Sequence, residues 1–220
     1  MERKKGDLLL SWDKKPVGFY LGDFKYYSFG ESRAVTVRCQ KRFKLIFYTE
    51  ESFESADLRG VDLKAVNLTG ANLSRADLTC ADLQCADLTG ANLTRAVLTR
   101  AVLYGAYLKG VDLTGAVLYG AVLNDADLTG TSLTGTVLSG TRLTGAHLRD
   151  TNLSGAVLRG AFLNSADLTG ANLEDANLYN AFLNSADLTG ANLEGANLRN
   201  TNLTNIKYDK HTVWPQGFKP

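Results

Sequence analysis

The sequence is poor in the residue types that build metal centres and disulfide frameworks. Its 220 residues include only 3 Cys, 2 His, 3 Pro and 1 Met. An odd number of cysteines without a CxxC spacing leaves little material for a disulfide framework or a zinc site. We therefore expect free thiols, no metal and no cofactor. Cytoplasmic residence, where thiols stay reduced, is the expected location.

Long apolar runs and catalytic motifs are also missing. No stretch approaches the roughly 18 consecutive apolar residues of a membrane span. The run Leu8–Leu10 near the N-terminus is too short for the apolar region of a signal peptide. A nucleophile elbow, a P-loop, a dinucleotide fingerprint and an HExxH motif are all absent. We therefore expect neither a membrane protein nor an enzyme.

Leucine and glycine, by contrast, recur in a strict pattern. From Leu58 to Leu203 a leucine stands at every fifth position, thirty times without interruption. Helical faces recur at about 3.6 residues and strand faces at 2, so neither explains a period of five. The 20–29-residue period of leucine-rich repeats does not fit either. Each five-residue unit must therefore be a short extended piece followed by a corner.

The other positions of the unit agree with this interpretation. Two residues before each leucine the chain has Ala 22 times, Thr five times and Val three times. Alternate residues of an extended segment share a face, so this small residue and the leucine both point inward. Two residues after each leucine there are 16 Gly and six Asn or Asp, which accept the positive φ of a type II turn. Four such corners predict a square coil of about twenty residues, with about 7.5 coils in a stack about 36 Å tall.

The units Ala86–Gly90 (ADLTG) and Ala91–Leu93 (ANL) resemble the pentapeptide-repeat family, whose signature is A(D/N)LXX. The resemblance covers residues 54–205, and the ending Tyr208–Phe218 is similar to the tail of many cyanobacterial members. It implies an all-β fold, a right-handed quadrilateral β-helix.

The two ends of the chain depart from the repeat. Residues 1–53 carry 11 Lys and Arg against 7 Asp and Glu. Their alternating stretches Val35–Cys39 and Phe43–Phe47 favour β-structure, with a turn near Gly30. Tyr48 and Phe53 lie on the leucine register, so the first coil should begin with aromatic residues. This segment either covers the open edge of the helix or is a small basic module that contacts a partner.

We predict three parts: a basic β-rich N-terminal segment at 1–53, the β-helix at 54–205 and a C-terminal cap at 206–220. In the cap the leucine register should continue weakly through Tyr208 and Val213, and Trp214, Pro215 and Phe218 supply bulk.

Positions twenty residues apart should stack, so the exterior can be sorted by face. One face carries an acidic column, made of Asp87, Asp127, Asp167 and Asp187. His147 falls between Asp127 and Asp167, and we expect a charged ladder there, since one imidazole and exposed carboxylates form a poor ligand set. Cys80 and Cys85 occupy consecutive corners, which should hold them too far apart for a disulfide.

Two neighbouring faces carry apolar side chains in their middle coils. One explanation is that β-branched residues suit exposed strands. The other is a protein-binding or self-association surface, because eight apolar residues stacked on adjacent faces can exceed the few hundred Å² of apolar surface usual on a monomer. The candidate interface consists of Val97, Val102, Tyr104, Val117, Tyr119, Val122, Val137, Val157, Phe162, Tyr179 and Phe182.

These features favour a non-enzymatic scaffold that binds a protein partner, or a second copy as a homodimer, through its flat faces. The resemblance allows a regulatory role, as in members that influence cell differentiation in filamentous cyanobacteria. The alternative is a DNA mimic that binds DNA gyrase or topoisomerase, as quinolone-resistance members do. Residues 54–205 hold 15 acidic and 10 basic residues, a net charge of −5. Threonine columns that bind ice are a third hypothesis, weakened by Lys109 and Arg149. Nucleic-acid binding is not expected, because the basic residues form no stripe.

Overall fold

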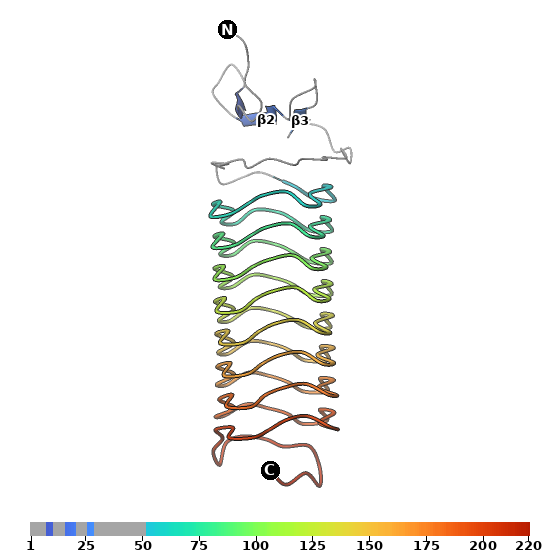
Figure 1. Cartoon of the computed structure of the whole chain (residues 1–220), viewed down its shortest axis with the longest axis vertical. Helices are drawn as coiled ribbons and strands as arrows, with labels where there is room; N and C mark the ends of the chain where they lie inside the picture. Colours follow the sequence, from blue (N-terminus) through green and yellow to red (C-terminus); the bar gives the residue numbers. More distant parts are fainter. Residues whose placement is uncertain (1–7, 11–15, 21–25, 29–51) are drawn as a thin grey trace.

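The computed structural model describes residues 8–10, 16–20, 26–28 and 52–220, and most of the last range winds into a stack of coils (Figure 1). Isolated parallel bridges join residues twenty positions apart, as in Asp57↔Asp77 and Asp77↔Val97. The predicted square coil of twenty residues is therefore confirmed. Backbone hydrogen bonds run between coils: the Leu78 amide donates to the Val97 carbonyl over 2.7 Å, and the Asp77 amide to the Ala56 carbonyl over 2.9 Å.

Leucines and small residues fill the interior, as predicted. The repeat leucines from Leu73 to Leu193 are at most 1% exposed. Phe53, 2% exposed, lies at the start of this core, whereas Tyr48 lies outside the described residues. Full burial of each leucine contributes about 1.5–3 kcal/mol, so the column of leucines dominates the stability of the rod.

Every corner from Ser55 to Asn205 has a positive φ, between 52° and 69°. At each corner the amide of the fourth turn residue donates a hydrogen bond to the carbonyl of the first. The Ala56 amide, for example, donates to the Phe53 carbonyl over 3.0 Å. Positive φ at the third position alone defines the type II turn predicted from glycine. The corners also include residues with no preference for this region, such as Ala65, Arg75 and Cys80. The regular ladder on both sides holds these residues in a conformation that they would not choose alone.

Threonine at the inward position has a role that the sequence pattern did not reveal. The Thr136 hydroxyl is buried and donates to the Leu113 carbonyl over 2.9 Å, from one coil to the coil before it. Because a buried hydroxyl is costly without a partner, this bond is what allows threonine to replace alanine inside the coil. The same bond is made by Thr131, Thr141, Thr151 and Thr201.

Three short strands precede the coils: β1 (Leu8–Leu10), β2 (Pro16–Tyr20) and β3 (Tyr26–Ser28). They pair in the order β1-β2-β3, antiparallel throughout, and Phe19 of β2 faces both Leu8 and Tyr27 in the register. The predicted stretches Val35–Cys39 and Phe43–Phe47, and the turn near Gly30, lie outside the described residues.

At the C-terminus the predicted register holds at Tyr208 and is wrong at Val213. Lys207 bridges Asp187, twenty residues earlier, so Tyr208 keeps the leucine position, although its side chain is 48% exposed in this last coil. Val213 is 45% exposed and does not take the leucine position. One extra residue before Thr212 shifts the frame, so Thr212 takes the inward position and Val213 pairs with Asn192. The Thr212 hydroxyl then donates to the Leu188 carbonyl over 2.9 Å, as the other inward threonines do.

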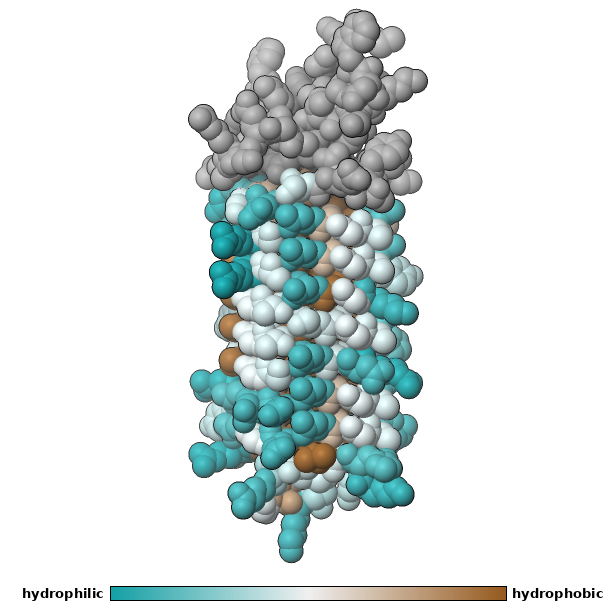
Figure 2. All heavy atoms as spheres, turned by 180° about the vertical axis from the view of Figure 1, so that it is seen from behind, coloured by the Kyte–Doolittle hydropathy of each residue, from teal (hydrophilic) through white to brown (hydrophobic). Residues whose placement is uncertain are grey.

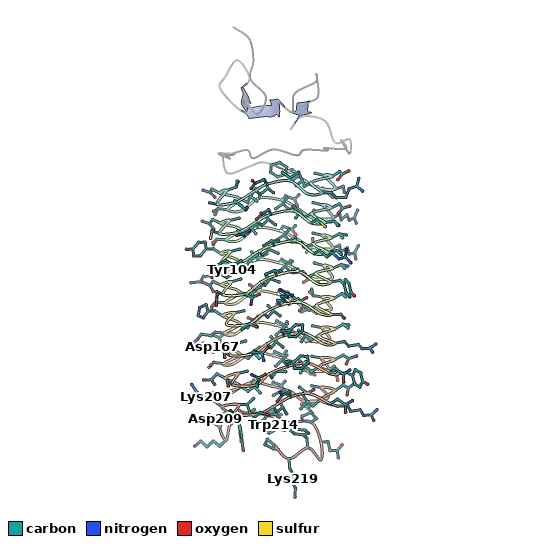
Figure 3. The ribbon with its side chains drawn as sticks, in the orientation of Figure 1. Tyr104, Asp167, Lys207, Asp209, Trp214 and Lys219 are labelled. Atoms are coloured by element: carbon teal, nitrogen blue, oxygen red, sulfur yellow. The ribbon has the colours of Figure 1, made fainter. Side chains whose placement is uncertain are left out.

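Asp209 makes this shift possible. The Gly190 amide would normally donate to the backbone carbonyl of residue 209, but it donates to the Asp209 carboxylate over 3.0 Å. Hydrogen bonds from Gly190, His211 and Thr212 outweigh the opposing effect of burial and hold the pKa of Asp209 below its ordinary value. Asp209 and Trp214 lie at the end of the stack (Figure 3), where Trp214 packs on Phe218 with ring centroids 5.3 Å apart.

Candidate interaction surface

Four columns of bridge residues define the four faces of the rod, and Figure 2 shows side chains of similar hydropathy stacked along its axis. We name each face after its column. The valine face carries Asp57, Asp77, Val97, Val117, Val137, Val157, Asn177 and Asn197. The phenylalanine face carries Asp62, Asp82, Val102, Val122, Arg142, Phe162, Phe182 and Asn202. The aspartate face carries Asn67, Asp87, Tyr107, Asp127, His147, Asp167, Asp187 and Lys207. The asparagine face carries Ser52, Asn72, Asn92, Asp112, Ser132, Asn152, Asn172 and Asn192.

The valine face is apolar over four successive coils. Val97, Val117, Val137 and Val157 are consecutive bridge partners, so their side chains form one unbroken column. Each is half-buried by its neighbours. Tyr119, two residues after Val117, is 52% exposed beside this column. The valine face thus presents a continuous apolar column with one exposed aromatic side chain beside it.

The phenylalanine face carries two apolar pairs instead of one column. Val102 pairs with Val122 at one end, and Phe162 pairs with Phe182 at the other. The two phenyl rings stack with centroids 5.1 Å apart and an interplanar angle of 5°, and each side chain is 40% exposed. Arg142, an exposed residue that the predicted interface did not include, separates the pairs.

The tyrosines of the predicted interface lie at different points along the two faces. Tyr104, 47% exposed, follows Val102 on the phenylalanine face. Tyr179 lies on the valine face one coil beyond Arg159, whose guanidinium carbon is 5.3 Å from the centroid of the Tyr179 ring. The apolar residues and two arginines therefore occupy the same pair of adjacent faces.

Asp and Asn in the bridge columns have a structural role that was not predicted from the sequence. Their outward side chains bend back, and Oδ1 accepts a hydrogen bond from the amide two residues later. The Oδ1 atom of Asn92, for example, accepts hydrogen bonds from the Thr94 amide over 3.0 Å and from the Thr94 hydroxyl over 2.7 Å. This Asx arrangement satisfies an amide that the ladder between coils leaves unpaired. The (D/N) position of the repeat is therefore explained by the corner that follows it.

Where the bridge residue is apolar, and also after Arg142, the corresponding amide has no acceptor among the described residues. On the valine face these amides belong to Thr99, Tyr119, Ser139 and Arg159; on the phenylalanine face they belong to Tyr104, Asn124, Thr144, Asn164 and Asn184. By equivalence with the Asx-bonded units, these N–H groups point outward. The apolar patch thus coincides with two rows of available hydrogen-bond donors.

The aspartate face places the predicted acidic residues in one column, with Tyr107 and His147 between them. The pKa of Asp87 is lowered chiefly by the hydrogen bond from the Thr89 side chain. Burial raises the pKa of Asp127, but hydrogen bonds from Thr129 and the charges of His147 and Lys109 leave it below the ordinary value. Burial also opposes the lowering at Asp187, where bonds from Thr189 and the Lys207 charge prevail.

Backbone bridges place His147 between Asp127 and Asp167 in the column, as the twenty-residue spacing predicts. Arg149 forms an ion pair with Asp167 at 3.6 Å. No group of three or more potential metal ligands gathers within residues 52–220 or the three short strands. Cys80 and Cys85 are free and exposed.

Comparison with known proteins places these features in context. The family model described as pentapeptide repeats (8 copies) matches residues 56–95, 96–135, 136–175 and 166–205. The structure of HetL, a pentapeptide repeat protein involved in heterocyst differentiation regulation in the cyanobacterium Nostoc, is similar at 33% identity with a TM-score of 0.56. The match covers 81% of this chain and 90% of HetL.

Two further solved structures are similar. Rfr23 from the cyanobacterium Cyanothece is 30% identical over 76% of this chain and 91% of its own, with a TM-score of 0.29. QnrB1, a plasmid-mediated fluoroquinolone resistance protein, is 22% identical over 73% and 78%, with a TM-score of 0.46. No curated protein matches the chain. The family and the HetL likeness support the right-handed quadrilateral β-helix. Within the described residues, no helix is long and apolar enough to cross a membrane.

Proposed function

Because the chain belongs to the pentapeptide-repeat family, we propose that it is a non-enzymatic scaffold, a rigid rod that binds another protein through its valine and phenylalanine faces. The observation that carries this proposal is the coincidence of the apolar columns with the unpaired outward amides. Apolar side chains and free donors on one flat surface are what a partner can bury and satisfy together.

The interior leaves little room for catalysis. Leucine and alanine fill each coil, and the inward threonines bond to backbone carbonyls. An extended surface that varies while the core stays constant is how repeat proteins commonly recognise partners. HetL is involved in regulating heterocyst differentiation, and we propose a regulatory role of this general kind for the chain. Cytoplasmic residence and the three-part division at 1–53, 54–205 and 206–220 stay predictions.

The structure offers variants that remove the apolar surface without disturbing the coil. Asn177 and Asn197 lie in the same column as the valines, and Asn177 Oδ1 accepts the Tyr179 amide over 3.2 Å. The double variant Val117→Asn/Val137→Asn therefore copies coils that the rod already contains. A matched control, Tyr107→Asn/Ser132→Asn, makes the same kind of change on the other two faces.

The experiment compares proteins retained from a lysate of the source cells by the wild type and both variants. A partner retained by the wild type and the control, and lost by Val117→Asn/Val137→Asn, supports the proposal. Equal retention by all three proteins contradicts it.

The alternative function, binding of DNA gyrase by a DNA mimic, would use the aspartate and asparagine faces. From residue 86 to residue 195 these two faces hold nine acidic and three basic residues. If the acidic side mimics DNA, the wild type should inhibit gyrase supercoiling, and replacing Asp127, Asp167 and Asp187 by Asn should abolish that inhibition. No effect of the wild type on supercoiling would remove this candidate.

A further inference from the structure

From residue 86 onward, the charges of the rod are divided between its two sides. We take the apolar side as the valine and phenylalanine faces beyond their first two coils, where Asp57, Asp62, Asp77 and Asp82 lie. It consists of residues 96–105, 116–125, 136–145, 156–165, 176–185 and 196–205. It carries Arg100, Arg142, Arg159 and Arg199 against Asp125 alone, a net charge of +3. The acidic side is the intervening residues from 86 to 195, with nine acidic and three basic residues, a net charge of −6. The near-neutral total hides this polarity.

The hydrogen-bonding groups are divided in the same way. Twelve amides in the coils follow a bridge residue that is neither Asp nor Asn, and they have no acceptor in the described chain. Nine of these twelve lie on the apolar side, as named above. Asp and Asn occupy most bridge positions of the acidic side, so their side chains already satisfy the amides there. The apolar side therefore offers hydrogen-bond donors and positive charge, and little to accept a bond.

From these two observations we propose that the apolar side binds an acidic, apolar peptide segment of a partner protein, laid along the axis of the rod. The partner's apolar side chains cover the valine column and the Phe162–Phe182 stack. Its carboxylates face Arg142 and Arg159, which lie within or beside those apolar residues, and its oxygen atoms accept from the outward amides. Guanidinium groups bind carboxylates in a fixed, directional geometry, so these arginines set the register of the segment.

The same arrangement disfavours a second copy that uses its own apolar side. Two such sides placed face to face would bring like-charged arginines together and leave two sets of amides without acceptors. Like charges placed opposite each other destabilise an interface and suppress the wrong partner. A homodimer through this surface is thus an outcome that the test must distinguish from peptide binding.

This inference rests on the proposed function and narrows it to one class of partner. The probe is a phage-displayed library of random linear peptides, selected on the full-length chain and resynthesised for binding assays. Three variants are compared with the wild type: Arg142→Glu/Arg159→Glu, the control Lys109→Glu/Arg149→Glu with the same charge change on the acidic side, and Val117→Asn/Val137→Asn.

We expect the selected peptides to be acidic and to contain apolar residues. Arg142→Glu/Arg159→Glu should weaken their binding about tenfold or more, and the control should leave it within about twofold. Binding should also weaken as salt rises, because exposed charge contributes to it.

Three other results overturn the inference, and they differ in what they imply for the scaffold. Neutral or basic peptides that are lost with Val117→Asn/Val137→Asn but keep binding Arg142→Glu/Arg159→Glu leave the interface in place and reject an acidic partner. A wild type that selects no peptide and forms a dimer broken by Val117→Asn/Val137→Asn points to self-association. No selection and no association reject both the acidic partner and this surface as an interface.

Discussion

The Oδ1 atom of Asn92 accepts hydrogen bonds from both the amide and the hydroxyl of Thr94, over 3.0 Å and 2.7 Å, and so closes the corner that follows Asn92. Removing this acceptor should weaken the corner. We expect Asn92→Ala to lower the free energy of unfolding by about 1 kcal/mol, the usual net value of one hydrogen bond.

The reverse change supplies a matched test. Val117→Asn installs an acceptor beside Tyr119, whose amide has none within the described part of the chain, and should leave stability unchanged or raise it slightly. Urea unfolding followed by circular dichroism measures both variants. A large loss of stability in Val117→Asn would contradict the role assigned to the side-chain acceptor.

Non-glycine residues in the corners should be a source of instability. Arg95 and Arg100 have φ values of 57° and 56°, a region that costs an L-residue about 1–2 kcal/mol. Replacing either by glycine should raise the free energy of unfolding by about 1 kcal/mol. Conversely, Gly110 has a φ of 66° and open space where a Cβ would lie, so Gly110→Ala tests backbone strain alone. We expect it to lower stability by about 1 kcal/mol. If all these variants had the same free energy of unfolding, positive φ at the corners would carry no free-energy cost for residues other than glycine, and the prediction would be wrong.

A leucine in the middle of the stack should be among the most sensitive positions. Leu123 is fully buried, and the coils above and below fix its surroundings. Truncation to alanine should cost about 2–5 kcal/mol, because the regular ladder limits how far the coil can collapse into the cavity. Thr136→Ala is a useful comparison, since it restores the common residue and the Leu113 carbonyl still accepts the Ala116 amide over 2.9 Å. We expect its effect to stay below about 1 kcal/mol. Similar losses in the two variants, measured by thermal or urea unfolding, would contradict this description of the core.

Stability should fall at acid pH because of the aspartate face. Asp87, Asp127 and Asp187 have lowered pKa values in the folded chain. A carboxyl whose folded pKa lies below its unfolded value of about 4 stabilises the fold above pH 4, and this contribution is lost as the pH falls through the folded pKa. The variant with all three changed to Asn keeps the Oδ1 acceptors but cannot titrate. Its free energy of unfolding should therefore depend less on pH below 4, and an unchanged dependence would contradict the assignment.

The repeat could be predicted from the sequence because one physical requirement recurs at each position. Leu58 and its successors must face inward, and the residue two positions later must adopt positive φ. The role of Asn92 was hidden, because an outward polar residue looks the same whether its side chain meets solvent or bonds to its own corner.

The C-terminal frame was missed for a different reason. A side chain, that of Asp209, replaces a backbone acceptor there, so one extra residue is tolerated where the period of five allows none. Arg142 was overlooked because the interface was assembled from apolar residues alone. Its importance appears only when all the charges of two adjacent faces are considered together.

The central claim, that the apolar side is the interface, is tested most directly by amide-resolved hydrogen exchange of the chain alone and bound to a captured partner. The amides of Thr99, Tyr119 and Ser139 point outward and have no acceptor in residues 52–220 or the three short strands. They should therefore exchange fast in the free chain and slowly in the complex. The Asx-bonded amides of Thr129, Thr169 and Thr189 on the aspartate face should exchange at the same rate in both states. Protection that appears on the aspartate face, with Thr99, Tyr119 and Ser139 unchanged, would contradict the account.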